Sequence, residues 1–240
     1  MPGSKRSVPP AVFFDLDDTL LACDSTAEQC WRDLCERFAS QLSGVSAAAL
    51  ADAIEERRAW FWQDADRHRR GRLDLPAARR AIVAAAFRRL SIAAPAVADA
   101  LADAYTTERE ERLELFPDAI PVLHRLRDQR VRLALLTNGS REFQRQKIDR
   151  FNLGALFDCI VIEGEFGVGK PDERVYRHAL TQFDVSPSDT WMIGDNLEWD
   201  VAAPQRLGMV GIWFDAPGRG LPAGSPVTPD RIIRRLSELL

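Results

Sequence analysis

The sequence has few of the residues that build zinc sites, disulfide frameworks and nucleic-acid-binding surfaces. Its 240 residues include four cysteines and three histidines, and no two cysteines form a C-x-x-C pair. We therefore expect no zinc site, and we expect the cysteines to be reduced thiols at apolar positions. The formal net charge is -4, whereas a protein that binds a nucleic-acid polymer carries a surplus of Lys and Arg. No nucleic-acid partner is expected.

Long apolar runs are also missing from the sequence. No uninterrupted stretch reaches the roughly 20 residues that cross a bilayer as a helix, and residues 1–10 lack the apolar segment of a secretory signal. The apolar fraction of 46% and the charged fraction of 28% are typical of a globular protein. We therefore expect a cytoplasmic protein with no membrane partner, either a monomer or a homodimer.

Short apolar runs alternate with helical patterns over most of the chain. The runs expected as strands are residues 11–14, 131–136, 159–162, 190–193 and 209–214. The helices expected between and after them are residues 117–129, 141–151 and 172–183, a short one ending near Leu207, and residues 230–240. Pro204 is expected to shorten or delay the helix near it. Such alternation predicts an α/β fold, a Rossmann-like doubly wound parallel sheet with helices on both faces.

One long segment interrupts this alternation. Residues 25–113 contain no strand pattern and are rich in Ala, Arg, Leu and Glu with helical periodicity. Gly44, Gly71 and Pro95 are expected to mark breaks, which gives about four helices. The sequence therefore predicts an α/β core of residues 1–22 and 114–240, interrupted after its first strand by an all-helical subdomain of residues 23–113.

The first expected strand ends in a cluster of acidic residues. Asp15, Asp17, Asp18 and Thr19 follow it directly, and two carboxylates two residues apart at a strand end can face one site. One carboxylate can attack phosphorus as a nucleophile, and the second can protonate a leaving alkoxide and then deprotonate water. A solvated acidic loop with a helix-capping aspartate is the alternative interpretation.

Three later segments follow other expected strands, and in an open parallel sheet such loops converge on the crevice at the carboxyl ends. Thr137 and Asn138 offer a hydroxyl and backbone amides to an oxyanion, or they merely cap a helix. Residues 164–170 match G-x-x-x-x-G-K, but Pro171 follows instead of Ser or Thr, so we reject a nucleotide-binding P-loop. Lys170 remains as a cation that can neutralise a phosphoryl group.

The last of these segments contains Asp195 and Asp200, just after the expected strand 190–193. Magnesium prefers hard oxygen ligands and usually takes one or two carboxylates alongside water and substrate phosphate. The two acidic residues therefore predict a magnesium site, although a capped helix start would also explain Asp200.

Taken in this order, the four segments resemble the haloacid dehalogenase-like hydrolase superfamily. The resemblance covers the whole expected core, and the matching residues are Asp15-x-Asp17-x-Thr19, Thr137, Lys170 and Gly194-Asp195-x-x-x-x-Asp200. The helical segment after the first loop resembles the cap of phosphoglycolate phosphatase-like members. The resemblance implies a Mg²⁺-dependent phosphatase that hydrolyses a small phosphorylated metabolite through a phosphorylated aspartate.

The resemblance also implies a role for each matching residue. Asp15 is the implied nucleophile and Asp17 the general acid/base, which Thr19 helps to orient. Lys170 is the implied third catalytic residue, because it would stabilise the negative charge of Asp15 and of the phosphate. The residues implied to bind the phosphoryl group are Asp18, Thr137, Asn138 and Lys170. The implied ligands of Mg²⁺ are Asp15, the backbone carbonyl of Asp17, and Asp195, with Asp200 supporting either the metal or Lys170.

Other activities found in the superfamily remain alternatives. A 2-haloacid dehalogenase needs the nucleophile but typically lacks an aspartate at the place of Asp17, whereas a sugar phosphomutase keeps both carboxylates. Thr19 favours a hydrolase over a mutase. A non-catalytic binding module is a remote alternative, because such proteins usually lose a core carboxylate or the lysine.

The helical subdomain holds a cluster of aromatic and basic residues. Under one hypothesis, members of this cluster recognise an aromatic or acidic leaving group, such as a nucleotide or flavin monophosphate. Under the other, which the sequence favours, the aromatic side chains pack the subdomain and the arginines coat its outer face. The cluster comprises Trp31, Trp60, Phe61 and Trp62 with Arg57, Arg58, Arg67, His68, Arg69 and Arg70.

Overall fold

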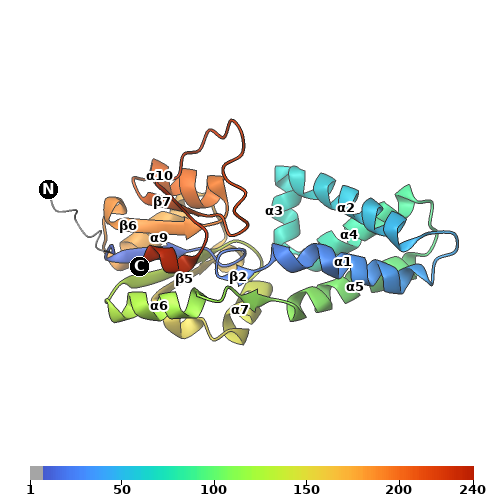
Figure 1. Cartoon of the computed structure of the whole chain (residues 1–240), viewed down its shortest axis with the longest axis horizontal. Coiled ribbons are helices and arrows are strands. Elements are labelled where there is room, and N and C mark those ends of the chain that lie inside the picture. Colours follow the sequence, from blue (N-terminus) through green and yellow to red (C-terminus); the bar gives the residue numbers. More distant parts are fainter. Residues whose placement is uncertain (1–7) are drawn as a thin grey trace. The chain divides into compact units, whose positions relative to one another are not determined.

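A computed structural model describes residues 8–240 of the chain, with the side chains of Asp24 and Ser25 excepted. The chain divides into two compact units (Figure 1). One unit, the core, consists of the described residues up to Ala22 together with Leu115–Leu240. The other unit is the insertion Cys23–Glu114, and we call it the cap. No helix among residues 8–240 combines the length and the apolar character needed to cross a bilayer.

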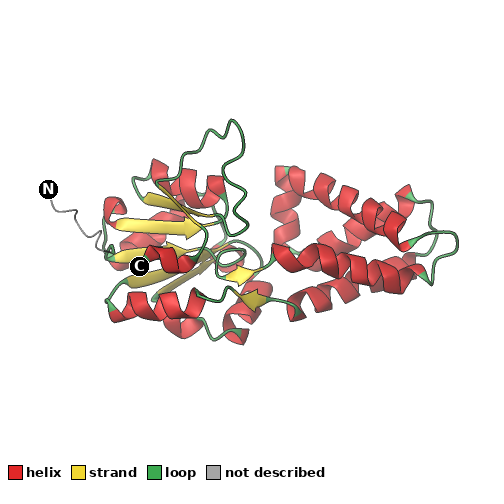
Figure 2. Cartoon of the chain, in the orientation of Figure 1, coloured by secondary structure: helices red, strands yellow, loops and turns green. Residues whose placement is uncertain are grey.

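The core is built on a six-stranded sheet with the strand order β5-β4-β1-β6-β7-β8, and all of its neighbouring strands are parallel. The strands are β1 (Ala11–Phe14), β4 (Arg132–Thr137), β5 (Cys159–Ile162), β6 (Thr190–Gly194), β7 (Val210–Phe214) and β8 (Arg231–Ile233). The chain moves outward from β1 in one direction and then in the other, and helices flank both faces of the sheet (Figure 2). The predicted α/β fold with a doubly wound parallel sheet is confirmed.

The register of the sheet brings the functional loops to one edge. Phe14, the last residue of β1, lies opposite Leu135 in β4 and Ile193 in β6. The loops that follow these three central strands therefore begin at the same edge of the sheet. All four residues of β1 are buried, because helices cover both faces of this central strand.

Helix α9 (Glu173–Phe183) shows how the core is packed. Its buried side chains, among them Tyr176 and Phe183, form one apolar cluster with Phe13 of β1 and Leu136 of β4. The other helical segments of the core are α6 (Ala119–Asp128), α7 (Arg141–Arg150), α8 (Glu163–Phe166), α10 (Ala203–Arg206), the 3-10 turns η1 (Gly154–Leu156), η2 (Pro187–Asp189) and η4 (Leu236–Leu239), and the π-helix η3 (Leu197–Ala202).

Two expectations about the C-terminal third have different outcomes. Pro204 stands in the first turn of α10, which has only four residues and follows a π-helix, so the helix is short as predicted. The predicted helix over residues 230–240 is wrong. Residues 231–233 instead form β8, in which Ile233 is buried and pairs with Phe214 of β7. Pairing with the open sheet edge has overridden a weak helical pattern, as tertiary contacts often do.

The cap contains five helices, one more than expected. They are α1 (Asp24–Ala39), α2 (Ala47–Gln63), α3 (Ala65–Leu73), α4 (Leu75–Arg89) and α5 (Pro95–Glu111). The additional break falls at Asp64, and the break expected at Gly71 falls at Asp74. The carboxylates of these two residues cap α3 and α4 by accepting hydrogen bonds from Arg67 N and Ala77 N. Gly71 does not end a helix, contrary to expectation, and lies inside α3.

The cap has its own apolar core, which includes Cys30, Cys35 and the fully buried Leu101. Trp31 stacks on Tyr105 with ring centroids 3.6 Å apart. All four cysteines of the chain are free, as predicted, and burial raises the pKa of Cys35 to about 12. Both connections to the core pass through a two-stranded ribbon, in which β2 (Leu21–Ala22) pairs with β3 (Glu114–Leu115).

We expect Leu101→Ala to destabilise the protein by about 2–5 kcal/mol, because the substitution leaves a cavity at the centre of the cap. Urea denaturation followed by circular dichroism measures the loss. Asp99→Ala is the control, since Asp99 lies on the same helix but is exposed. Equal losses in the two variants would contradict the assignment of Leu101 to the cap core.

Candidate active site

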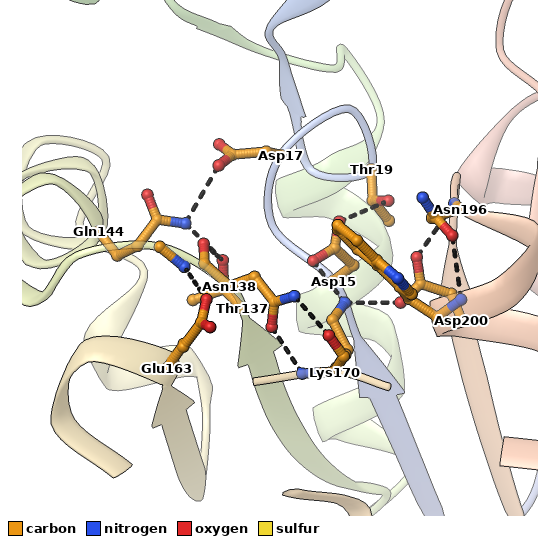
Figure 3. A network of polar contacts seen from close by, with 12 residues as sticks. Asp15, Asp17, Thr19, Thr137, Asn138, Gln144, Glu163, Lys170, Asn196 and Asp200 are labelled. Carbon is orange, nitrogen blue, oxygen red and sulfur yellow. Dashed lines mark hydrogen bonds and ion pairs between the residues drawn. The ribbon is translucent and has the colours of Figure 1, made fainter. Parts of the chain in front are cut away.

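Polar side chains from four loops meet at the carboxyl edge of the core sheet (Figure 3). Asp15 follows β1, and its backbone N–H donates to Ile193 O of β6 at 2.9 Å. Thr137 ends β4, and Asp195 follows β6. Lys170 reaches the same place from the segment after β5 and α8. The structure thus brings together residues that are far apart in the sequence. Asp15 and Asp200, for example, are separated by 185 positions.

Lys170 is the centre of this arrangement. Its side chain is buried, and Nζ donates to Oδ1 of Asp15 at 2.7 Å and to Oδ1 of Asp200 at 2.6 Å. Burial on its own lowers the pKa of Lys170, but the carboxylates of Asp15 and Asp200 outweigh it and raise that pKa, so the ammonium group stays charged. Asp200 thus pairs with Lys170, which is one of the two supporting roles that the resemblance implies for it.

The backbone of Lys170 is fixed as firmly as its side chain. Asn138 Nδ2 donates to Lys170 O at 2.8 Å, and Lys170 N donates to Asn138 Oδ1 at 2.7 Å. The side chain of Asn138 therefore holds Lys170 in place, in addition to any role of its backbone amide.

Glu163 is a buried residue beside this contact that the sequence reasoning missed. It accepts a hydrogen bond from Gly139 N at 3.0 Å.

Three carboxylates form a cluster beside Lys170. Oxygens of Asp15, Asp195 and Asp200 all lie within 4.8 Å of one another. Burial raises the pKa of Asp15 to about 7, with Lys170 opposing the shift and Asp200 adding to it. Desolvation, followed by repulsion from Asp15 and Asp200, raises the pKa of Asp195, although its side chain still reaches solvent. The cluster holds more negative charge than Lys170 alone can balance.

The donor set of this cluster suits a hard divalent cation, because every ligand it offers is a carboxylate oxygen. Asp200 has both oxygens engaged, Oδ1 by Lys170 Nζ and Oδ2 by Asn196 N at 3.1 Å. Asp15 is engaged in the same way, Oδ1 by Lys170 Nζ and Oδ2 by Thr19 Oγ1, and it shares with Asp195 and Asp200 the place where a cation could be held. Gly194 permits this crowding, since a Cβ there would lie 2.2 Å from Cγ of Asp200.

Asp17 points away from Asp15 toward helix α7 (Figure 3). Lys147 Nζ donates to its two carboxylate oxygens at 2.8 and 2.9 Å, and Gln144 Nε2 donates to Oδ2 at 3.1 Å. The same amide nitrogen of Gln144 donates to Oγ1 of Thr137. Gln144 and Lys147 are both buried, so a single helix face orients the predicted acid/base and a predicted phosphate ligand.

The sequence reasoning missed Gln144 and Lys147, although a signal was present. Both occupy buried positions three residues apart on α7, at places where an amphipathic helix would ordinarily carry apolar side chains. A buried lysine and a buried glutamine need polar partners, and the loop of Asp17 supplies them.

The loop after Asp17 turns sharply and brings Thr19 back to Asp15. Asp18 adopts the left-handed backbone conformation with φ 58°, and its N–H donates to Leu21 O at 2.7 Å. Thr19 is fully buried, and its Oγ1 donates to Oδ2 of Asp15 at 3.5 Å. The predicted orienting residue thus contacts Asp15 itself.

Residues 9–208 match the family model described as haloacid dehalogenase-like hydrolase. The chain belongs to this family. A match of this extent covers the first acidic loop, the cap and every loop of the candidate site. The haloacid dehalogenase-like family that the sequence resembles is therefore confirmed.

Several relatives of this hydrolase carry names of phosphatases. A phosphoserine phosphatase from Thermus thermophilus is 40% identical over 147 residues, which is 61% of this chain and 57% of that protein. An N-acylneuraminate-9-phosphatase from Rattus norvegicus is 27% identical and spans 95% of this chain and 91% of its own length. The predicted enzyme class, a phosphoric monoester hydrolase, is confirmed by these relatives together with the family match.

The fold of the hydrolase also agrees with solved structures. A putative hydrolase of this superfamily, YfnB from Bacillus subtilis, has a TM-score of 0.72 with 21% identity, and the two chains cover 97% of each other. At this identity the likeness concerns the fold.

The charge imbalance in the carboxylate cluster predicts how stability depends on pH. Asp15 and Asp195 have folded pKa values above the unfolded value of 3.8, so the folded state binds more protons than the unfolded state. In chelator, stability should therefore fall as pH rises from about 5 to about 8. Asp195→Asn should raise the melting temperature at pH 8 in chelator, by an amount equivalent to about 1 kcal/mol after allowing for solvent screening.

Thermal denaturation in chelator and in excess Mg²⁺ provides the measurement. Mg²⁺ should raise the melting temperature of the wild type and leave that of Asp195→Asn nearly unchanged. Asp149→Asn is the matched control, since Asp149 is exposed on α7 and should change neither result. An Asp195→Asn protein that is less stable than the wild type in chelator at pH 8 would show that the cluster is not repulsive.

Proposed function

We propose that this hydrolase is a Mg²⁺-dependent phosphatase that cleaves a small phosphomonoester through a phosphorylated Asp15. The observation that carries the proposal is the buried ion pair of Lys170 with Asp15, beside a carboxylate cluster that is short of positive charge. The phosphatase names of the relatives support the reaction class. The YfnB structure, which is described as bound to magnesium, supports the choice of metal.

In the first half of the proposed reaction, an oxygen of Asp15 forms a bond to phosphorus while the bond from phosphorus to the alkoxide breaks. Asp17 gives a proton to the departing alkoxide. In the second half, Asp17 takes a proton from water as the water oxygen bonds to phosphorus, and the bond from phosphorus to Asp15 breaks. Inorganic phosphate leaves, and both carboxylates return to their starting states.

The remaining side chains support this chemistry by charge and orientation. Lys170 keeps an oxygen of Asp15 in place and balances the charge that develops on the phosphoryl group. A divalent cation held by Asp15 and Asp195 would add positive charge at the same place and favour the ionised form of Asp15. Thr137 and the backbone amide of Asn138 are proposed to donate hydrogen bonds to the phosphoryl oxygens, and the backbone carbonyl of Asp17 to complete the metal site. The backbone N–H of Asp18, the other residue implied to bind phosphate, already donates to Leu21 O.

The alternatives from the sequence are less well supported. A 2-haloacid dehalogenase has no use for the Asp17 carboxylate, yet this chain holds that carboxylate with two buried side chains, Gln144 and Lys147. A mutase uses the same carboxylates, so product analysis has to separate it from a phosphatase. A silent binding module is disfavoured because each core carboxylate and the lysine are in place.

Asp15→Asn should reduce phosphate release at least about a thousandfold, because the amide cannot act as the nucleophile. We would assay para-nitrophenyl phosphate and a panel that includes phosphoserine and N-acylneuraminate 9-phosphate, with Mg²⁺ and with chelator. Asp149→Asn serves as the control for the same chemical change at an exposed position. Release that persists in Asp15→Asn, or that is equal with and without metal, would rule out the proposed mechanism.

Lys147→Met should lower kcat by about 10- to 100-fold and change KM much less, because Asp17 loses its fixed orientation while the phosphoryl site keeps its residues. Steady-state kinetics on the best substrate of the panel measures both constants. Lys147→Arg should restore part of kcat, since a guanidinium can also pair with Asp17. A rise in KM at constant kcat would instead place Lys147 in ground-state substrate binding.

A further inference from the structure

The cap contains a large cavity that the proposed reaction does not use. It has a volume of about 790 Å³ and is lined by residues of α2, α3 and α4 together with Asp74, which caps α4. This volume lies within the range of about 300–1,000 Å³ that is typical of small-molecule sites. Every lining residue lies between positions 57 and 89, so the cavity is a property of the cap alone.

The lining of the cavity is strongly basic. Five arginines contribute to it, namely Arg57, Arg67, Arg70, Arg88 and Arg89, against the single carboxylate of Asp74. That carboxylate already accepts a hydrogen bond from Ala77 N at 3.1 Å. The excess of guanidinium groups attracts an anion, and arginine binds phosphate and carboxylate oxygens in a planar, two-pronged geometry.

Neighbouring acidic residues do not remove this excess. Arg67 pairs with Asp64 at 4.0 Å, and Arg57 and Arg89 share one partner, Glu56, at 2.5 and 2.6 Å. Within residues 8–240, Arg70 and Arg88 form no ion pair. The Nε atom of Arg57 is buried and donates to no acceptor in the part of the chain that the structure describes. A buried donor without a partner destabilises the protein, and an anionic ligand would supply the missing acceptor.

Apolar surface accompanies the charge. Trp60 is 47% exposed, whereas Trp31 is buried against Tyr105, and Phe61 packs edge-to-face on Trp62. The packing hypothesis from the sequence therefore explains Trp31, Phe61 and Trp62. It does not explain Trp60, whose side chain is exposed. The guanidinium of Arg67 lies 3.8 Å from the centroid of the Trp60 ring and donates to Trp60 O, which fixes the indole beside the cavity.

Small residues keep the cavity open. Helix α4 contributes four alanines to the lining, Ala77, Ala78, Ala81 and Ala85. Gly71 of α3 allows the ring of Phe61 to approach closely, since a Cβ there would lie 2.6 Å from a ring carbon. Larger side chains at these positions would fill the space that the arginines surround.

We infer that the cap cavity is a binding site for a small organic anion that joins a phosphate or carboxylate group to a planar, apolar body. The arginines bind the anionic group, and Trp60 with the alanine wall of α4 contacts the planar part. Two sources supply this chemistry, the non-reacting part of the substrate itself or a separate effector, and the experiment distinguishes them.

The probes are AMP and FMN, which each carry a planar ring and a phosphate. Isothermal titration calorimetry with the full-length Asp15→Asn protein measures binding without turnover. Arg57→Gln and Trp60→Leu, each added to Asp15→Asn, should weaken the binding of at least one probe tenfold or more. Arg89→Gln provides a second, exposed variant in case Arg57→Gln misfolds. Adenosine and inorganic phosphate, as the two halves of AMP, should each bind more weakly than AMP does.

Arg58→Gln is the matched control. Arg58 lies next to Arg57 on α2 and pairs with Glu55, but it does not line the cavity, so its substitution should leave binding unchanged. Binding of neither probe at about 1 mM, or binding that the cavity variants do not weaken, would overturn the inference. The experiment measures binding and not turnover. Its result therefore tests the cap site independently of whether the protein is a phosphatase.

Orthovanadate, which competes for a phosphoryl site, distinguishes the two sources. A substrate whose leaving group the cap recognises should meet three conditions. The wild type hydrolyses it with Mg²⁺, orthovanadate displaces it, and its KM rises in Trp60→Leu. A probe that is not hydrolysed and stays bound in saturating orthovanadate is an effector.

Discussion

The contact of Lys170 with Asp15 and Asp200 is the constraint on which the rest of the core site depends. A buried ammonium group is stable only with close anionic partners, and here two carboxylates from different loops supply them. The loops after β1 and β6 must therefore begin beside each other. The parallel register of these two strands ensures this, because the strands end side by side. The third carboxylate, Asp195, leaves the group with an excess of negative charge, and the proposed cation site rests on this excess.

Much of this arrangement follows from local sequence patterns. The strands at residues 11–14 and 159–162 were predicted at their observed bounds, because a short apolar run between polar loops has few other solutions in an α/β chain. The four candidate loops could be located because each follows such a strand. Their convergence needed only the rule that parallel strands share a carboxyl edge. The roles of the individual residues in them remain proposals.

The features that the sequence reasoning missed depend on contacts between distant residues. Gln144 and Lys147 stand at positions of α7 where apolar side chains would be usual, but their partner Asp17 lies more than 120 positions earlier, so no local pattern connects them to it. The edge strand β8 replaces an expected helix because the open side of β7 offers it hydrogen bonds. In the cap, Asp64 and Asp74 end and restart helices through capping bonds that hydrophobic periodicity does not reveal.

The ribbon of β2 and β3 has a consequence for how such a protein can change over evolution. The chain leaves the core and returns to it on two strands that are hydrogen-bonded neighbours, so the whole insertion is attached through one narrow stem. An insertion attached in this way can be lengthened, shortened or replaced while the sheet register stays the same. Ligand preference can then diverge among descendants through exchange of a module, with the reaction chemistry inherited intact.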